Sequence, residues 1–162
     1  IHLPALPVVN AKFKAFDQTR FDRDLEIQVH SAVRICRAVL PAMAKARFGR
    51  VLFIQTSYTI GCPPKNTAAY VMAKSAIGGL VKSLAVEYAR FGVTVNCVAP
   101  SMMETNFLKT RPISSCRPRR RKPHGPQRNA RGRCTRHAFL LSDEAGFITG
   151  VTLPVTGGSA IV

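Results

Sequence analysis

Several features that assign proteins to particular classes are missing from this sequence. No run reaches the roughly 18 apolar residues that a membrane-spanning helix needs. No basic start followed by an apolar stretch and a small-residue cleavage site marks a signal peptide. The five cysteines show no CxxC spacing, which argues against a disulfide framework and indicates a reducing compartment. We therefore expect a cytoplasmic protein that does not cross a membrane.

A metal-binding pattern is also missing. Cys116, His124, Cys134 and His137 are the candidate zinc ligands, but their spacing matches no common zinc site, and we expect no metal. The chain begins with Ile1 and not with Met, which we interpret as a sign of a fragment of a longer protein.

Acidic residues are scarce, with 8 Asp and Glu against 24 Lys and Arg. The net charge of +16 raises the possibility of nucleic-acid binding, so its location matters. Residues 114–136 alone hold eight Arg and one Lys without any acid, which is more than half of the excess. The basic charge is thus concentrated in one segment.

The hydrophobic pattern predicts alternating helices and strands. Residues 19–47 carry a helical pattern, in which Pro41 predicts a bend or break, and 68–90 form the clearest helix. Continuous apolar runs at 49–57 and 93–100 predict strands buried on both faces, and a further strand is expected at 151–155. Strand, helix and strand in this order predict a crossover unit with parallel strands.

Tyr70 and Lys74 stand four positions apart at the start of the clearest helix, and therefore on one face of it. A nearby ammonium favours the phenolate, lowers the pKa of a tyrosine and allows it to exchange a proton with a substrate oxygen. Ser57 follows the preceding strand, at the end where open α/β sheets bind ligands. Each feature alone is common, but their combination in this order predicts a catalytic site.

The same stretches resemble a known family, the short-chain dehydrogenase/reductases, and within it the 3-oxoacyl-[acyl-carrier-protein] reductase-like group. The matching phrases are AVLPAMAKARFGRVLFIQTS, AAYVMAKSAIGGLVKSLAVEYARFGVTVNCVAPSMMET and FLLSDEAGFITGVTLPVTGG. The resemblance covers about residues 19–110 and 137–158. It implies an α/β fold with a doubly wound, Rossmann-like parallel sheet and NAD or NADP bound at the strand C-termini.

The resemblance also implies roles for individual residues. Tyr70 would be the general acid in reduction or the base in oxidation, and Lys74 would bind the nicotinamide ribose and lower the tyrosine pKa. Ser57 would hydrogen-bond the substrate oxygen. Thr56 is its rival, because counting forward from Gly49-Arg50 favours Thr56 and counting back from Tyr70 favours Ser57. The expected cofactor contacts are Tyr70, Lys74, Pro100, Ser101, Met103 and Thr105.

This sequence departs from the family pattern in several places, and these departures limit which family features and residue roles can be expected here. The glycine-rich turn that receives the pyrophosphate is absent, as are the first strands, so we expect 1–162 to be the C-terminal part of one Rossmann-like domain. The family's catalytic asparagine aligns with Gln28, or less well with His30. A glutamine can still order water, but its longer side chain shifts the amide.

Residues 112–136 replace a helix and loop that the family places over the substrate. Three interpretations remain: a frameshifted stretch, which the family-like flanks favour, a charged linker, or a nucleic-acid-binding insert. Our leading hypothesis is an NAD(P)(H)-dependent oxidoreductase acting on a small molecule or acyl thioester, assembled as a homo-oligomer through its long helices. The alternative is a non-catalytic remnant that binds nucleic acid through 117–136, which lacks aromatic residues for base stacking.

Overall fold

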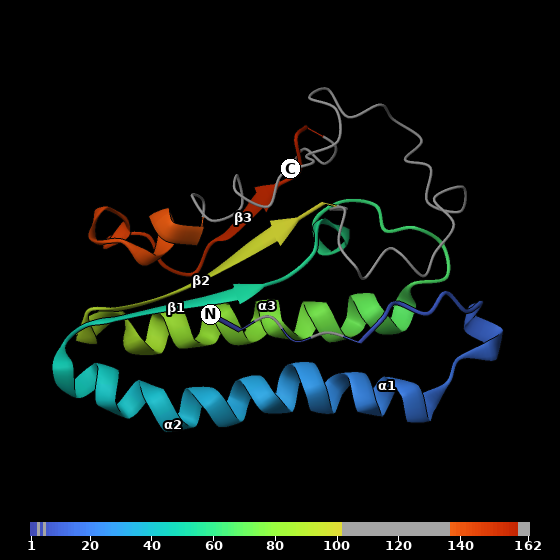
Figure 1. Ribbon diagram of the computed structural model, residues 1–162, viewed down its shortest axis with the longest axis horizontal. Helices are drawn as coiled ribbons and strands as arrows, with labels where there is room; N and C mark the ends of the chain where they lie inside the picture. Colours follow the sequence, from blue (N-terminus) through green and yellow to red (C-terminus); the bar gives the residue numbers. More distant parts are fainter. Residues whose placement is uncertain (3, 5, 102–136, 159–162) are drawn as a thin grey trace.

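The computed structural model describes residues 1–2, 4, 6–101 and 137–158. Met103, Thr105 and residues 112–136 lie outside the described residues, and so does every prediction made for them. Within the described residues, three strands form one sheet with helices packed against it (Figure 1).

The sheet consists of β1 (Gly49–Ile54), β2 (Val93–Pro100) and β3 (Thr152–Val155), in the order β1-β2-β3. Both neighbouring pairs are parallel, with Ile54 opposite Val98 and Pro100 opposite Val155. The predicted parallel α/β sheet is therefore confirmed. The first strand ends at Ile54, earlier than the predicted 57, because the chain turns into the short helix η3 (Ser57–Thr59).

The long helices lie together on one side of the sheet (Figure 1). They are α1 (Gln18–Leu25), α2 (Ser31–Ala46) and α3 (Ala68–Tyr88). Phe53 and Val95 point from the strands into this layer, where they share a buried cluster with Leu40, Ile77 and Val81. Neighbouring strand residues face the opposite side, since side chains alternate along a strand.

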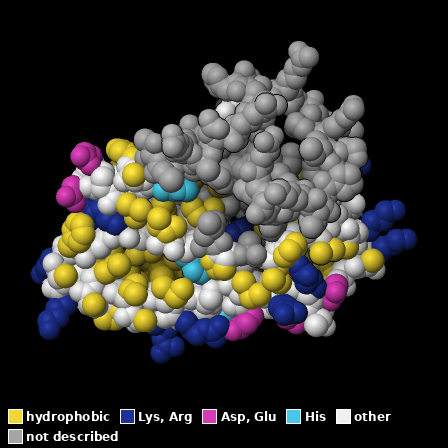
Figure 2. Space-filling model, viewed as in Figure 1, with side chains coloured by type: hydrophobic (Ala, Val, Ile, Leu, Met, Phe, Trp, Pro, Cys, Tyr) yellow, Lys and Arg dark blue, Asp and Glu magenta, His cyan; other side chains and the backbone are white. Residues whose placement is uncertain are grey.

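The other face of the sheet is covered by residues 137–148. Leu52, Ile54 and Val98 pack there with Leu140 and Ala145 in a second buried cluster. Both faces of the central strands are thus buried, as expected for parallel strands with apolar runs. Figure 2, drawn in the same orientation as Figure 1, shows hydrophobic side chains gathered on the surface where β1 and α2 meet. Lys and Arg side chains lie mostly around the edge of this hydrophobic area.

The predicted break at Pro41 is wrong, because α2 runs through Pro41 to Ala46. Pro41 is exposed on the outer side of the helix, while Ala32, Cys36 and Leu40 bury the inner side and hold both halves against the core. The irregularity lies earlier, in a π-helical turn, Glu26–His30, between α1 and α2. Such turns are rare and often occur at functional sites.

Helix α3 follows the predicted stripe, since Ile77, Val81 and Ala85 are buried along β2. A Cβ at Gly78 would lie 2.6 Å from Nε2 of Gln55, so glycine leaves room for that amide. Gly92 ends the helical segment in a left-handed conformation (φ 71°), as predicted. Ala68–Phe91 is long and apolar enough to cross a membrane, but core helices share these properties.

Candidate active site

The carboxyl ends of β1 and β2 lie side by side and carry several of the predicted site residues. Gln55, Thr56 and Ser57 continue directly from β1 and are buried. Pro100 ends β2, Ser101 follows it, and both residues are half-buried. In open α/β sheets this edge is where ligands bind, so the topology places these residues where the sequence predicts them.

Tyr70 is the third residue of α3 and is half-buried. Burial raises the pKa of the phenol, and the charge environment of Tyr58 and Asp24 raises it further, while a hydrogen bond with the Thr56 side chain lowers it. The rings of Tyr58 and Tyr70 meet edge to face, with centroids 6.3 Å apart. At neutral pH the phenol is therefore protonated and can act as a proton donor.

Lys74 points into the protein, one helical turn after Tyr70. Its Nζ donates a hydrogen bond to the carbonyl oxygen of Ile54 at 2.9 Å, and the residue is 4% exposed. Burial lowers the pKa of Lys74 to about 8. The role of Lys74 in lowering the tyrosine pKa stays a prediction, because burial is the largest influence on the pKa of Tyr70 here and the Lys74 ammonium is bonded to the end of β1.

The two candidate hydroxyl groups differ in their surroundings. The Thr56 side chain acts on the pKa of Tyr70, and its Oγ1 accepts from the backbone N–H of Tyr58 at 3.4 Å. Ser57 begins η3, where its carbonyl oxygen accepts from Ile60 and Gly61. Residue counting along the sequence leaves Thr56 and Ser57 as rivals, and the effect of the Thr56 side chain on the pKa of Tyr70 favours Thr56.

Gln28 lies in the π-helical turn and is 1% exposed. Its Nε2 donates to Oδ1 of Asp24 at 3.2 Å, while its Oε1 is buried without a hydrogen-bond partner among the described residues. His30 is exposed and bonded to Glu26, so Gln28 is the residue of this pair that faces the interior.

Asp24 is a buried residue of the site that the sequence patterns do not identify. Its position near a helix start suggests an exposed acid that favours the helix dipole. In the structure Asp17 caps α1, accepting from the backbone N–H of Arg20 at 2.9 Å, and Asp24 turns inward. The available signal is its spacing of four residues before Gln28, which places both on one helical face.

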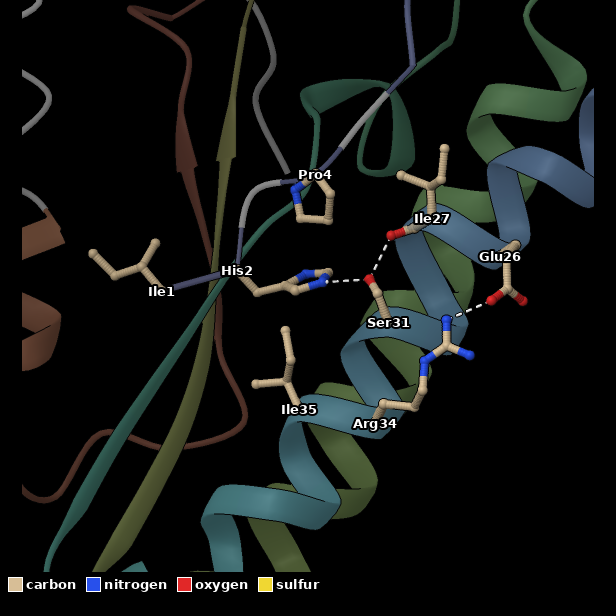
Figure 3. Close-up of a pocket in the computed structure, with 8 residues that line it drawn as sticks. All are labelled: Ile1, His2, Pro4, Glu26, Ile27, Ser31, Arg34 and Ile35. Atoms are coloured by element: carbon tan, nitrogen blue, oxygen red, sulfur yellow. Dashed lines mark hydrogen bonds and ion pairs between the residues drawn. The ribbon is translucent and has the colours of Figure 1, made fainter.

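The structure describes an open cavity of about 540 Å³ away from these residues. It lies between the first residues of the chain and the α1–α2 connection, and Figure 3 shows the His2 ring directed toward Ser31 across it. His2 Nε2 and Ser31 Oγ are 2.9 Å apart. Tyr70, Lys74 and Thr56 do not line this cavity, so the candidate site is defined by the strand ends.

Within the described ranges, no group of three His, Cys, Asp or Glu side chains is placed to hold a metal. The groups near the strand ends fit the nicotinamide end of a dinucleotide. They are the Tyr70 phenol, the Thr56 hydroxyl, the Lys74 ammonium and the half-buried end of β2. No glycine-rich turn for a pyrophosphate is present in the sequence.

The depressed lysine pKa predicts how stability depends on pH. Between about 8 and the ordinary value of 10.5, an unfolded chain keeps a proton on Lys74 that the folded chain has released. The free energy of unfolding should therefore rise with pH over this interval, by up to about 3 kcal/mol. Lys74→Met should remove this rise in urea unfolding measured across the interval.

The matched control is Lys82→Met, which changes an exposed lysine of the same helix. It should keep the wild-type pH dependence. An identical pH dependence in wild type and Lys74→Met would show that Lys74 is not a buried, titrating group.

Comparison with known proteins places this geometry in a family. A family model described as enoyl-(acyl carrier protein) reductase matches residues 4–160. The chain is 39% identical over 142 residues to the 3-oxoacyl-[acyl-carrier-protein] reductase FabG of Escherichia coli, covering 85% of this chain and 57% of the relative. It is 34% identical over 148 residues to dehydrogenase/reductase SDR family member 4 of Sus scrofa, covering 86% of this chain and 51% of the relative.

A solved structure shows the same arrangement of elements. The 3-oxoacyl (acyl-carrier-protein) reductase of Agrobacterium tumefaciens C58 with NADP bound superposes with a TM-score of 0.84 at 25% identity, covering 98% of this chain and 64% of that one. The chain thus spans less than two thirds of the length of these relatives and corresponds to their C-terminal part. With its parallel sheet and its Tyr70–Lys74 pair, this chain belongs to the short-chain dehydrogenase/reductase family.

Proposed function

We propose that the chain contributes the proton-transfer part of an NAD(P)(H)-dependent oxidoreductase that interconverts a carbonyl and an alcohol. The observation that carries this proposal is the half-buried Tyr70 phenol, whose ring meets the Tyr58 ring just beyond the end of β1 and which lies one helical turn before the buried Lys74. Family membership supports it, because the matched relatives are named as reductases and dehydrogenases.

Tyr70, Lys74, Pro100 and Ser101 are the described residues that would hold the nicotinamide end of the cofactor. Met103 and Thr105 remain proposed contacts outside the described residues. When bound, the nicotinamide supplies or accepts the hydride. The Agrobacterium relative was solved with NADP, which supports NADP or its analogue NAD here.

In this proposal, residues of the chain transfer the proton to and from the substrate oxygen. Tyr70 is protonated at neutral pH because burial raises its pKa, so in the reduction direction it can give its proton to the substrate oxygen as negative charge develops there. Thr56, whose side chain acts on the pKa of Tyr70, is proposed to donate a hydrogen bond to the same oxygen. In the oxidation direction Tyr70 takes the proton back from the alcohol.

The proposed substrate class follows the name of one matched relative. FabG of Escherichia coli is named for 3-oxoacyl groups on acyl carrier protein, so we propose a 3-oxoacyl thioester or a related small carbonyl compound. Gln28, at the position of the family's asparagine, completes the proposed catalytic set of Ser57 or Thr56, Tyr70 and Lys74.

The test uses a chimera in which the N-terminal part of Escherichia coli FabG precedes residue 1. With NADPH or NADH and a 3-oxoacyl thioester, we expect substrate-dependent oxidation of the nicotinamide, measured by absorbance. Thr56→Val removes the hydroxyl but keeps the shape, and should lower turnover about 100-fold. Ser57→Ala is the matched comparison and should leave most of the turnover.

Two outcomes would count against this assignment. A folded chimera that oxidises neither nicotinamide with any 3-oxoacyl thioester or ketone would contradict the proposed function. A large loss in Ser57→Ala with little loss in Thr56→Val would return the hydroxyl role to Ser57.

A further inference from the structure

A buried carboxyl group lies next to the proposed catalytic residues without belonging to the set that the family resemblance implies. Asp24 is 6% exposed on α1, and its Oδ1 accepts the amide N–H of Gln28 at 3.2 Å. Its charge acts on both Tyr70 and Lys74 of α3, the helix packed against α1. A buried carboxylate needs partners of this kind, because burial without them is costly.

The first contact fixes the Gln28 amide. An ionised carboxylate only accepts hydrogen bonds, so the amide must present its nitrogen to Asp24. The reverse orientation would place the amide oxygen against the carboxylate oxygen. Oε1 is therefore held away from Asp24, and it is buried with no hydrogen-bond partner in the described part of the chain.

The second effect concerns the charge around Lys74. Burial has the largest effect on the pKa of Lys74 and lowers it. Two neighbours, Cys97 and Asp24, raise this pKa and offset part of the effect of burial. Burial raises the pKa of the Cys97 thiol to about 12, so the thiol is neutral wherever Lys74 titrates. Of these two neighbours, Asp24 is thus the one whose carboxylate supplies negative charge when it is ionised.

Other charged groups modify this pair. Burial raises the pKa of Asp24, whereas Gln28, Arg20 and Lys74 lower it. Arg20 Nε lies 3.9 Å from Asp24 Oδ2, and the Arg20 guanidinium also donates to the carbonyl oxygen of Pro7 at 2.7 Å. His2 faces Lys74 as a further basic group, and its pKa is lowered by burial and by the lysine charge.

We propose that Asp24 is a positioning residue of the site: its carboxylate holds the Gln28 amide in one orientation and supplies the negative charge that faces Lys74. This inference rests on the proposed function, because it assigns Asp24 to the residues around the proton donor. Asp24 also favours the protonated form of Tyr70, the form that donates in carbonyl reduction.

The experiment uses the chain itself and needs no turnover. The pKa of Lys74 is measured by NMR titration of protein labelled with ¹³C at lysine Cε, the resonance being assigned by its loss in Lys74→Met. Asp24→Asn keeps an oxygen that can accept from Gln28 but removes the charge. It should lower the Lys74 pKa from about 8 by about one pH unit.

The control is Asp22→Asn, which changes an exposed acid of the same helix bonded to Gln18 at 2.7 Å. It should leave the Lys74 titration where it is in the wild type. An Asp24→Asn titration that coincides with the wild type would overturn the counter-charge role, whether or not the chimera turns over substrate.

The orientation of Gln28 has its own readout. Its side-chain ¹⁵N–H₂ resonances should be retained in Asp24→Asn and displaced in Asp24→Leu, which removes the acceptor. Undisplaced resonances in a folded Asp24→Leu variant would overturn the positioning role. If Asp24→Leu does not fold, Asp24→Glu tests the same contact, because a longer side chain must displace the amide signal if the bond exists.

Discussion

Tyr70→Phe should lower the turnover of the chimera about 1,000-fold, because it removes the proton donor and leaves the ring in place. The phenol is half-buried and protonated at neutral pH, and it is the group proposed to give its proton to the substrate oxygen. The loss should fall on kcat, measured by nicotinamide absorbance at saturating substrate. The loss in kcat should exceed any loss in affinity for the nicotinamide, measured by fluorescence titration, because Lys74, Pro100 and Ser101 remain as proposed contacts.

Tyr88→Phe is the matched control, since Tyr88 is a half-buried tyrosine at the other end of α3. It should keep the turnover of the parent chimera. Equal turnover in Tyr70→Phe and the parent would remove Tyr70 from the proton-donor role and leave the proposed mechanism without its central group.

Phe53→Ala should lower the free energy of unfolding by about 3–5 kcal/mol, the typical cost of removing a buried aromatic ring. Phe53 is 1% exposed near the carboxyl end of β1 and packs with Leu40, Ile77 and Val95 between the sheet and the helices. Its ring also meets the His2 ring edge to face, with centroids 5.5 Å apart. Urea unfolding followed by circular dichroism measures the change.

Phe147→Ala provides the comparison, because Phe147 is fully exposed. Its unfolding free energy should stay within about 0.5 kcal/mol of the wild type. A loss for Phe53→Ala as small as that for Phe147→Ala would mean that β1 and the helices do not share the packed core described above.

The secondary structure was predictable where patterns are local and regular. The apolar runs at 49–57 and 93–100, separated by a helical stripe from Ile77 to Tyr88, predict parallel strands joined by a crossover. The structure confirms this arrangement, including Gly92 at the end of the helical segment. Tyr70 and Lys74 share a helix face for the same reason, since a spacing of four residues is one turn.

Pro41 shows where local rules fail. A proline inside a helix removes one hydrogen bond and predicts a break. The buried contacts of Cys36 and Leu40 nevertheless keep α2 continuous on both sides of it. The actual irregularity, the π-helical turn at Glu26–His30, has no local sequence signal of comparable strength.

The amino-acid pattern alone was enough to predict the parallel α/β sheet, the family and the Tyr70–Lys74 spacing, because each depends on residues close together along the chain. The folded arrangement was needed to find that the Thr56 side chain acts on the pKa of the Tyr70 phenol, that Lys74 turns to the carbonyl of Ile54, and that Asp24 is buried against Gln28. These contacts depend on how α1, α3 and the end of β1 pack. Side-chain hydrogen bonding and burial, which set the pKa values of the site, arise only after distant segments meet.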